Sequence, residues 1–202
     1  MKLVVMTVPE FFVEEDRILA ALFDEGMEDL HISKPGASPV YYERLLSLLP
    51  YECHRHITVH EHFYVKSEYE LEGIHLASAS DEPPAGYRGY YSRTCTDFES
   101  LGKAKRRARY VFLKDIFRSE DDAATGPSFT SEELAEARKC GLIDRHVYAL
   151  GGVTADNIKA AKDMGFGGVV VCGDLWGKFD LHDSADYKEL LRHFARLRKA
   201  AW

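Results

Sequence analysis

Two stretches late in the chain decide the fold: Ala149-Leu150-Gly151-Gly152-Val153-Thr154 and Gly168-Val169-Val170-Val171-Cys172-Gly173-Asp174-Leu175. Each is a short apolar run that ends in glycine, and a segment with helical periodicity separates the two. This pattern is typical of neighbouring parallel strands that are buried on both faces. A glycine where a strand ends has no Cβ, so backbone N–H groups can approach a ligand closely.

Outward from these stretches, strand and helix patterns alternate along the whole chain. The sequence predicts strands over residues 2–7, 29–33, 56–59, 73–76, 87–93, 110–113, 146–150 and 168–171. It predicts helices over residues 13–23, 40–49, 61–70, 96–107, 130–141, 154–164 and 187–199. Capping boxes, Thr96 with Glu99 and Thr130 with Glu133, mark two of the helix starts. Residues 77–86 contain Pro83-Pro84 and no helical pattern, so the fourth helix should be short or absent.

Eight such units predict a closed barrel of parallel strands. We therefore expect an α/β fold, a single (β/α)8 TIM barrel over residues 1–202, with lean loops because the chain is short for this fold. The alternative is an open doubly wound sheet, but that fold does not naturally use eight units, and the first turn lacks GxGxxG. The long polar segment 114–129 is expected to be a lid or a binding loop.

Composition and charge narrow the class of protein. The net charge of −7 argues against a general nucleic-acid binder or a binder of anionic membranes. No apolar run is long enough to cross a membrane. The four cysteines are widely spaced without a CxxC pair, which favours a reduced, cytoplasmic location over a disulfide framework.

Chemistry in a parallel barrel belongs where the strands end. The loops after strands seven and eight of such barrels commonly bind phosphate, so we assign phosphate binding to Gly151, Gly152, Cys172 and Gly173. Lys34 after strand two could neutralise an anion or donate a proton, and Asp115 after strand six could act as a general base. Each could instead be a solvated surface charge. Other candidates at strand ends are His31, Ser33, His60, Glu61, Ser92 and Thr94.

Four histidines lie within nine residues, at positions 54, 56, 60 and 62. Two HxH pairs can indicate a metal, but the first pair lies at the wrong end of a barrel for a catalytic ion, so zinc is disfavoured. His60 with Glu61 is better placed to bind an anion or magnesium. His75 is expected to point into the barrel as a packed, hydrogen-bonded histidine.

Four segments of the chain are similar to the motifs of one protein family. Glu72-Gly73-Ile74-His75-Leu76 resembles ADGVHLGQ, and the segment from Tyr110 to Ser119 resembles DYVGFGPVFPT. Ala149-Leu150-Gly151-Gly152-Val153 with Asn157 resembles AIGGI followed by a helix asparagine, and the segment from Gly168 to Leu175 resembles GVAVVSAI. These are motifs of the thiamine phosphate synthases and the related thiazole tautomerase TenI. The resemblance spans nearly the whole chain and implies a (β/α)8 barrel.

The family joins a pyrimidine methyl diphosphate to a thiazole phosphate while Mg²⁺ holds the leaving diphosphate. The resemblance places the thiazole phosphate at the glycine pair, the family's strand-five serine at Ser92, and a magnesium carboxylate at Glu61. The diphosphate side departs from the family: the strand-two arginine is lost and its lysine shifted, and the strand-four aspartate is lost unless Asp81 replaces it. The tautomerase's catalytic histidine corresponds to Asp115.

These departures favour a TenI-like enzyme that acts on a thiazole phosphate by proton transfer. An active synthase with Mg²⁺, a non-catalytic binding protein for thiazole or thiamine phosphate, and an unrelated phosphate-sugar isomerase stay open. The expected partner is a small phosphorylated substrate. Aromatic residues that could be exposed, namely Phe11, Phe12, Tyr41 and Tyr42, permit a homodimer without requiring one.

Overall fold

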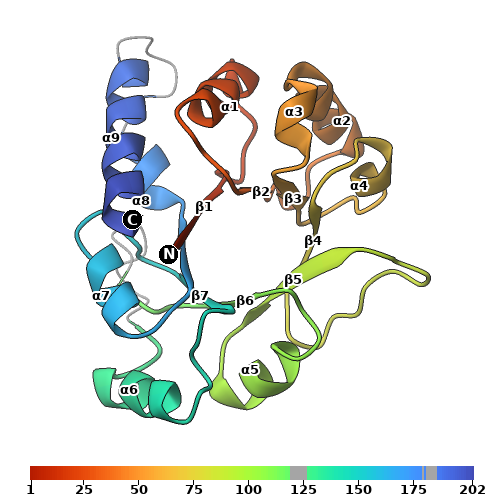
Figure 1. Cartoon of the computed structure of the whole chain (residues 1–202). Helices are drawn as coiled ribbons and strands as arrows, with labels where there is room; N and C mark the ends of the chain where they lie inside the picture. Colours follow the sequence, from red (N-terminus) through yellow and green to blue (C-terminus); the bar gives the residue numbers. More distant parts are fainter. Residues whose placement is uncertain (119–126, 179, 181–185) are drawn as a thin grey trace.

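The computed structural model describes residues 1–118, 127–178, 180 and 186–202. Its eight strands pair in parallel, in chain order, and the last pairs with the first, so the sheet is a closed barrel and not an open one. The strands form the inner ring in Figure 1 and the helices surround it. They are β1 (Lys2–Met6), β2 (Leu30–Ile32), β3 (Ile57–Val59), β4 (Gly73–Leu76), β5 (Tyr90–Cys95), β6 (Val111–Leu113), β7 (Val147–Leu150) and β8 (Gly168–Val171).

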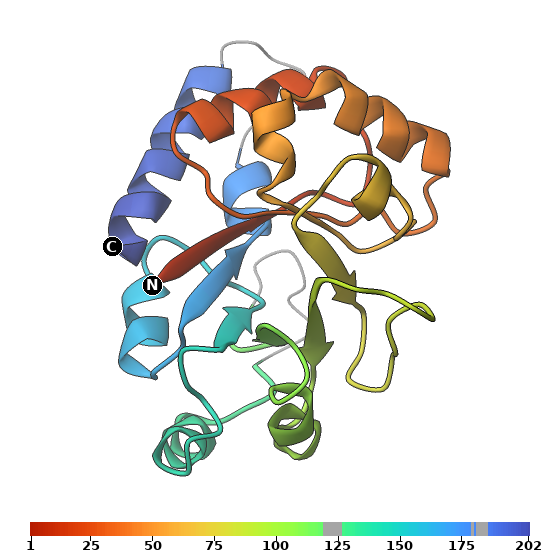
Figure 2. The same ribbon diagram turned by 45° about the vertical axis from the view of Figure 1, so that its right-hand side comes forward.

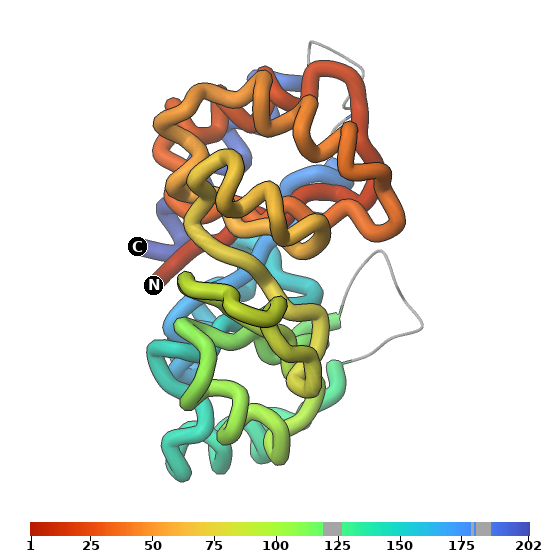
Figure 3. Tube along the Cα trace, turned by 90° about the vertical axis from the view of Figure 1, so that its right-hand side faces the viewer, coloured from red at the N-terminus to blue at the C-terminus, as the bar shows by residue number. Residues whose placement is uncertain are grey.

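Helices connect the strands, with one exception. They are α1 (Glu15–Asp24), α2 (Pro39–Leu48), α3 (Tyr51–His54), α4 (Val65–Glu68), α5 (Phe98–Ala104), α6 (Ser131–Lys139), α7 (Ile158–Asp163), α8 (Gly173–Trp176) and α9 (Asp186–Ala201). Residues 77–89, all described, pass from β4 to β5 without a helix, which confirms the missing fourth helix. The side views place α1 to α3 over one side of the barrel and α5 and α6 over the other (Figures 2 and 3).

Three element predictions need correction. Helix α4 is much shorter than residues 61–70, because His62 and Glu70 at its flanks have left-handed backbone angles, φ 50° and 54°. Strand β5 starts three residues later than predicted, at Tyr90. Helix α5 is capped by Asp97, whose carboxylate accepts the Ser100 N–H at 2.7 Å, so the capping box at Thr96 is wrong.

The Thr130–Glu133 capping box of α6 is confirmed, with both reciprocal bonds present. Ser38 and Pro39 start α2 as expected. The single-turn helices α3 and α8 were not predicted, because four residues are too few to show a periodic pattern.

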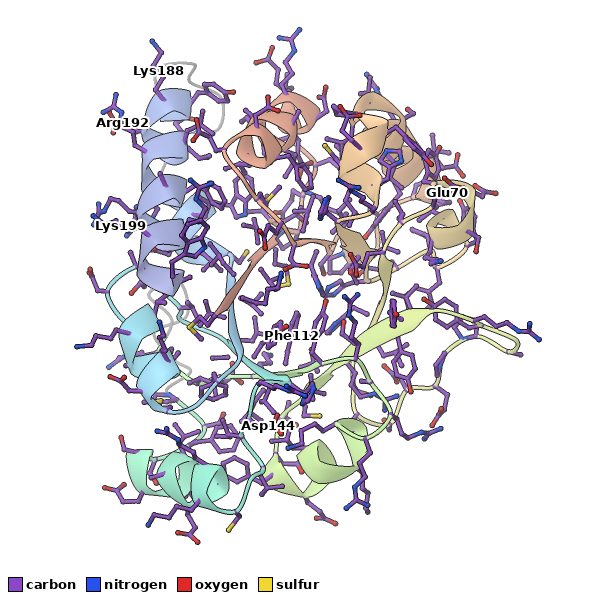
Figure 4. All side chains as sticks on the ribbon, viewed as in Figure 1. Glu70, Phe112, Asp144, Lys188, Arg192 and Lys199 are labelled. Carbon is purple, nitrogen blue, oxygen red and sulfur yellow. The ribbon has the colours of Figure 1, made fainter. Side chains whose placement is uncertain are left out.

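Two apolar layers hold the barrel together. The larger lies between the strands and the helices, and the smaller fills the barrel interior around Val4, Phe112 and Val170. Phe112 is labelled near the barrel centre in Figure 4. Gly168 is required in this interior, because a Cβ there would lie 2.7 Å from the Tyr148 ring. Among the described residues, no helix is long and apolar enough to cross a membrane.

Candidate functional site

A cavity of about 590 Å³ opens at the carboxyl ends of β6, β7 and β8. Its lining combines the Gly-Gly turn, the segment after β6 and the start of α8. The lining residues include Lys114, Asp115, Phe117, Arg118, Gly151, Gly152, Thr154, Asn157, Cys172, Gly173, Asp174 and Lys178. The five residues predicted for phosphate and proton transfer at this end of the barrel, Asp115 with the four phosphate residues, therefore share one cavity.

The Gly-Gly turn is built for close backbone contact. Gly151 and Gly152 have φ of 98° and 59°, angles that side chains disfavour. A Cβ on Gly151 would lie 2.9 Å from the Cα of Asp115, and one on Gly152 would lie 2.4 Å from the carbonyl oxygen of Arg118. The segment after β6 thus lies directly against the turn after β7, and Asp115, itself at φ 61°, faces it.

Asn157, at the start of α7, fixes the turn. Its side-chain amide donates to the carbonyl oxygen of Gly152 at 2.7 Å, and its Oδ1 accepts the N–H of Thr154 at 2.9 Å. These two bonds satisfy backbone groups on both sides of Val153. This gives a physical role to the helix asparagine noted in the sequence.

Asp174 on α8 organises the wall beside Gly173. Its side chain is 2% exposed and contacts Lys178 Nζ through Oδ1 and His193 Nε2, from α9, at 2.8 Å through Oδ2. Burial acts to raise the pKa of this carboxyl, but the Lys178 and His193 contacts outweigh burial and leave the pKa lowered. The residue is therefore a paired carboxylate.

Arg118 and Lys178 also line the cavity, and neither was predicted from the sequence. Both are exposed cations on the lining, together with Lys114. No motif marks either position. The available signal was that basic residues follow shortly after the ends of β6 (Lys114 and Arg118) and β8 (Lys178).

A second group of predicted residues meets inside the barrel, on β2 to β6. His31 Nδ1 lies 2.9 Å from His60 Nε2, and His31 Nε2 lies 2.8 Å from the Tyr110 hydroxyl. His75 contacts the hydroxyls of Ser92 and Thr94 at 2.7 and 2.9 Å, which confirms a packed, hydrogen-bonded His75. Ser92 and Thr94 lie within β5 and do not end it.

Burial keeps these histidines uncharged. Removal from water lowers the pKa of His60 to about 3 and those of His31 and His75 well below the ordinary value. The neighbouring imidazoles act in the same direction on His31 and His75. The cluster is thus a neutral network at physiological pH.

A third group surrounds Lys34, which is fully buried and not solvated. Its Nζ lies 2.5 Å from Glu15 Oε1 and 2.7 Å from the Glu10 carbonyl oxygen, with the Phe11 ring centre at 4.7 Å. Burial lowers the pKa of Lys34 and raises that of Glu15, and their contact opposes both shifts. Lys34 therefore ties the loop after β2 to α1.

Glu61 joins this third group. Its Oε2 accepts the backbone N–H of Lys34 at 3.1 Å and the hydroxyl of Tyr42. Tyr42 is buried, contrary to its use as a possible dimer aromatic, whereas Tyr41 is 54% exposed. Ser33 also has a backbone role here: its N–H donates to Thr7 Oγ1 at 3.1 Å.

Comparisons with known proteins identify the family. A solved thiamine phosphate pyrophosphorylase from Bacteroides thetaiotaomicron is 46% identical, with a TM-score of 0.88, over 100% of this chain and 98% of that one. The chain belongs to the thiamine phosphate pyrophosphorylase family. This is the family of thiamine phosphate synthases that the sequence resembles.

More distant solved structures share the fold. A thiamine phosphate pyrophosphorylase from Pyrococcus furiosus is 18% identical, with a TM-score of 0.73, over 99% of this chain and 95% of that one. A mutant tryptophan synthase α-subunit from Pyrococcus furiosus is 14% identical, with a TM-score of 0.65, over 98% and 97%. No protein-family model and no curated protein matches the chain.

Proposed function

We propose that this family member is a TenI-like enzyme of thiamine biosynthesis that acts on a thiazole phosphate by proton transfer. The proposal rests on the cavity at the carboxyl ends of β6, β7 and β8, called the mouth cavity below. There, Asp115 lies against the Gly151-Gly152 turn. The turn and Gly173 would hold the phosphate with backbone N–H groups, and Lys114, Arg118 and Lys178 would supply positive charge. Cys172 is the small residue that keeps this wall open.

Asp115 is the proposed proton-transferring group. A carboxylate at this position can take a proton from one carbon of the bound thiazole and return it to another, which is net isomerisation. The phosphate holds the ring in place during both transfers. His31, His60, Ser33, Ser92 and Thr94 belong to the two other groups, so we propose that their roles in substrate binding are indirect.

The residues at the positions where the family binds diphosphate and Mg²⁺ are less suited to those ligands. Of the candidate carboxylates, Glu61 uses Oε2 for two protein donors, and Asp81 Oδ2 accepts the Ser78 N–H. Within the described part of the chain, no group of three acidic, histidine or cysteine side chains besides the histidine cluster can gather around an ion. The ammonium group of Lys34 forms a buried ion pair with Glu15. The proposed reaction therefore does not use magnesium.

An active synthase is the second candidate. The 46% identity to a thiamine phosphate pyrophosphorylase favours it, because that protein carries the synthase's name. A protein that binds thiazole phosphate without turnover would be the third outcome.

Two assays on the same purified protein separate these candidates. The first mixes pyrimidine methyl diphosphate, thiazole phosphate and Mg²⁺ and follows thiamine phosphate by the fluorescence of its oxidised form. The second follows tautomerisation of thiazole carboxylate phosphate by NMR. The proposal expects turnover in the second assay and none in the first. Formation of thiamine phosphate in the first assay would show that the protein is a synthase. If thiazole phosphate binds but neither assay shows turnover, the protein is a non-catalytic binding protein.

A further inference from the structure

Three imidazoles from adjacent strands converge in the upper half of the barrel interior. His31 lies on β2, His60 directly follows β3, and His75 lies on β4. One ring nitrogen from each lies within 4.8 Å of those of the other two. None of the three lines the mouth cavity, so the proposed proton transfer leaves this cluster unused.

We propose that His31, His60 and His75 bind one Zn²⁺ ion. Neutral imidazole nitrogen is a preferred zinc ligand, and three histidines leave a fourth position open for water or another ligand. Burial favours the neutral, ligating form. His60 is the half-buried member of the three.

Two of the three histidines, His31 and His75, have the outer contacts of ligating histidines. A metal-bound histidine ordinarily donates its other ring N–H to an oxygen. The Tyr110 hydroxyl lies 2.8 Å from His31 Nε2 and can accept its N–H, which leaves Nδ1 facing the cluster. Ser92 and Thr94 flank the two nitrogens of His75, so either nitrogen can turn inward while the other keeps a hydroxyl partner.

The three imidazole rings must move slightly for their nitrogens to bind one ion. Two nitrogens on a tetrahedral zinc are about 3.3 Å apart, so the His31–His60 contact at 2.9 Å must open slightly. The His60 and His75 rings stack with centres 4.2 Å apart at 19°, so one ring must rotate to aim its lone pair at the ion. The rotation gives up one hydroxyl contact of His75.

The alternative is a hydrogen-bonded network that needs no metal. It predicts no zinc uptake, and it predicts that removing one histidine changes stability only. The two accounts therefore differ in a direct binding measurement that does not depend on the enzyme's activity.

The test titrates Zn²⁺ into EDTA-treated, untagged protein by calorimetry, with Co²⁺ as a spectroscopic probe. His60→Gln is the main variant, because His60 is half-buried and its loss should be tolerated. His62→Gln is the matched control, since His62 lies two residues away and contacts only the Ala37 carbonyl among the described hydrogen bonds. Circular dichroism checks that both variants fold.

We expect one zinc per chain in the wild type and in His62→Gln, and affinity weakened at least 10-fold in His60→Gln. Bound Co²⁺ should show the visible absorption of a tetrahedral nitrogen site in the wild type. No uptake by the wild type would overturn the proposal, as would equal affinity in His60→Gln. If the His60→Gln protein does not fold, the wild-type stoichiometry and Co²⁺ spectrum still decide the question.

Discussion

Position 152 shows how one backbone angle can fix a residue. Its φ of 59° and the carbonyl of Arg118 against it leave room for no side chain. The sequence predicted a glycine turn here from the Gly-Gly pair, because glycine is the residue that such angles favour. It could not predict that the segment after β6 presses on the turn, since that contact depends on the positions of two loops at the ends of neighbouring strands.

Gly152→Ala should lower the free energy of unfolding by about 3 kcal/mol, from left-handed strain together with the clash. It should also weaken phosphate binding, because the turn must move. Gly36→Ala is the matched control: φ there is 76°, but nothing lies within 4 Å of an added Cβ. That control should lose about 1 kcal/mol. Urea unfolding of both variants makes the comparison, and equal losses would show that the clash has no effect.

Asp115→Asn should lower the rate of tautomerisation at least about 100-fold, because an amide cannot carry the proton. Phosphate affinity should not weaken, since the change removes a negative charge from the cavity. Kinetics and phosphate titration measure the two effects. Asp156→Asn, at an exposed aspartate outside the cavity lining, should keep wild-type rates. A modest, equal loss in both variants would rule out Asp115 as the base.

At the scale of elements, α1 and the loop after β2 are joined by the buried pair of Lys34 and Glu15. The pair is 0% and 3% exposed at its side chains, so neither charge is screened by water. This ion pair could not be predicted from the sequence. Lys34 lies in a loop and Glu15 in a helix nineteen residues away, and neither position shows a pattern that indicates burial. Most strand patterns were predictable for the opposite reason: strands such as β6 and β8 are buried along their whole length and read as apolar runs. The start of β5 was not, because this strand is polar and begins at the exposed Tyr90.

Lys34→Met should destabilise the protein by about 3 kcal/mol, because it leaves Glu15 charged and buried without its partner. The double variant Glu15→Gln with Lys34→Met should recover part of this loss. Phosphate affinity should be unchanged in both. Chemical denaturation and phosphate titration check these expectations. A stable Lys34→Met protein that binds phosphate weakly would instead place Lys34 in the substrate site.

At the scale of the whole molecule, the barrel interior carries polar chemistry where many barrels carry only apolar layers. His31, His60 and His75 were each visible in the sequence at a strand end. Their meeting depends on strand register, such as His31 beside Thr58 and His75 beside Ser92, which the sequence does not specify. The fold was therefore predictable from periodicity, whereas the grouping of the candidate site residues required the closed barrel.

The buried histidines should make stability depend on pH. Burial lowers the pKa of His60 to about 3, and those of His31 and His75 are also lowered. The unfolded chain, with histidine pKa near 6.5, binds more protons below that pH, so the free energy of unfolding is largest above it and falls as the solution is acidified.

Each such histidine contributes a slope of up to about 1.4 kcal/mol per pH unit below pH 6. From pH 7 to 5 we expect a loss of at least about 2 kcal/mol in urea unfolding with EDTA present. His75→Asn should flatten the curve. A wild-type stability that is constant down to pH 5 would contradict neutral burial of the cluster.

Deuterium incorporation from the solvent reports directly on the proposed proton transfer at the barrel mouth. The protein is incubated with thiazole carboxylate phosphate in D₂O, and the product is examined by NMR and mass spectrometry. We predict deuterium at the reprotonated carbon for the wild type and at least about 100-fold slower incorporation for Asp115→Asn. A wild-type protein that incorporates no deuterium, yet forms thiamine phosphate from the two family substrates, would rule out proton transfer as the function of this site.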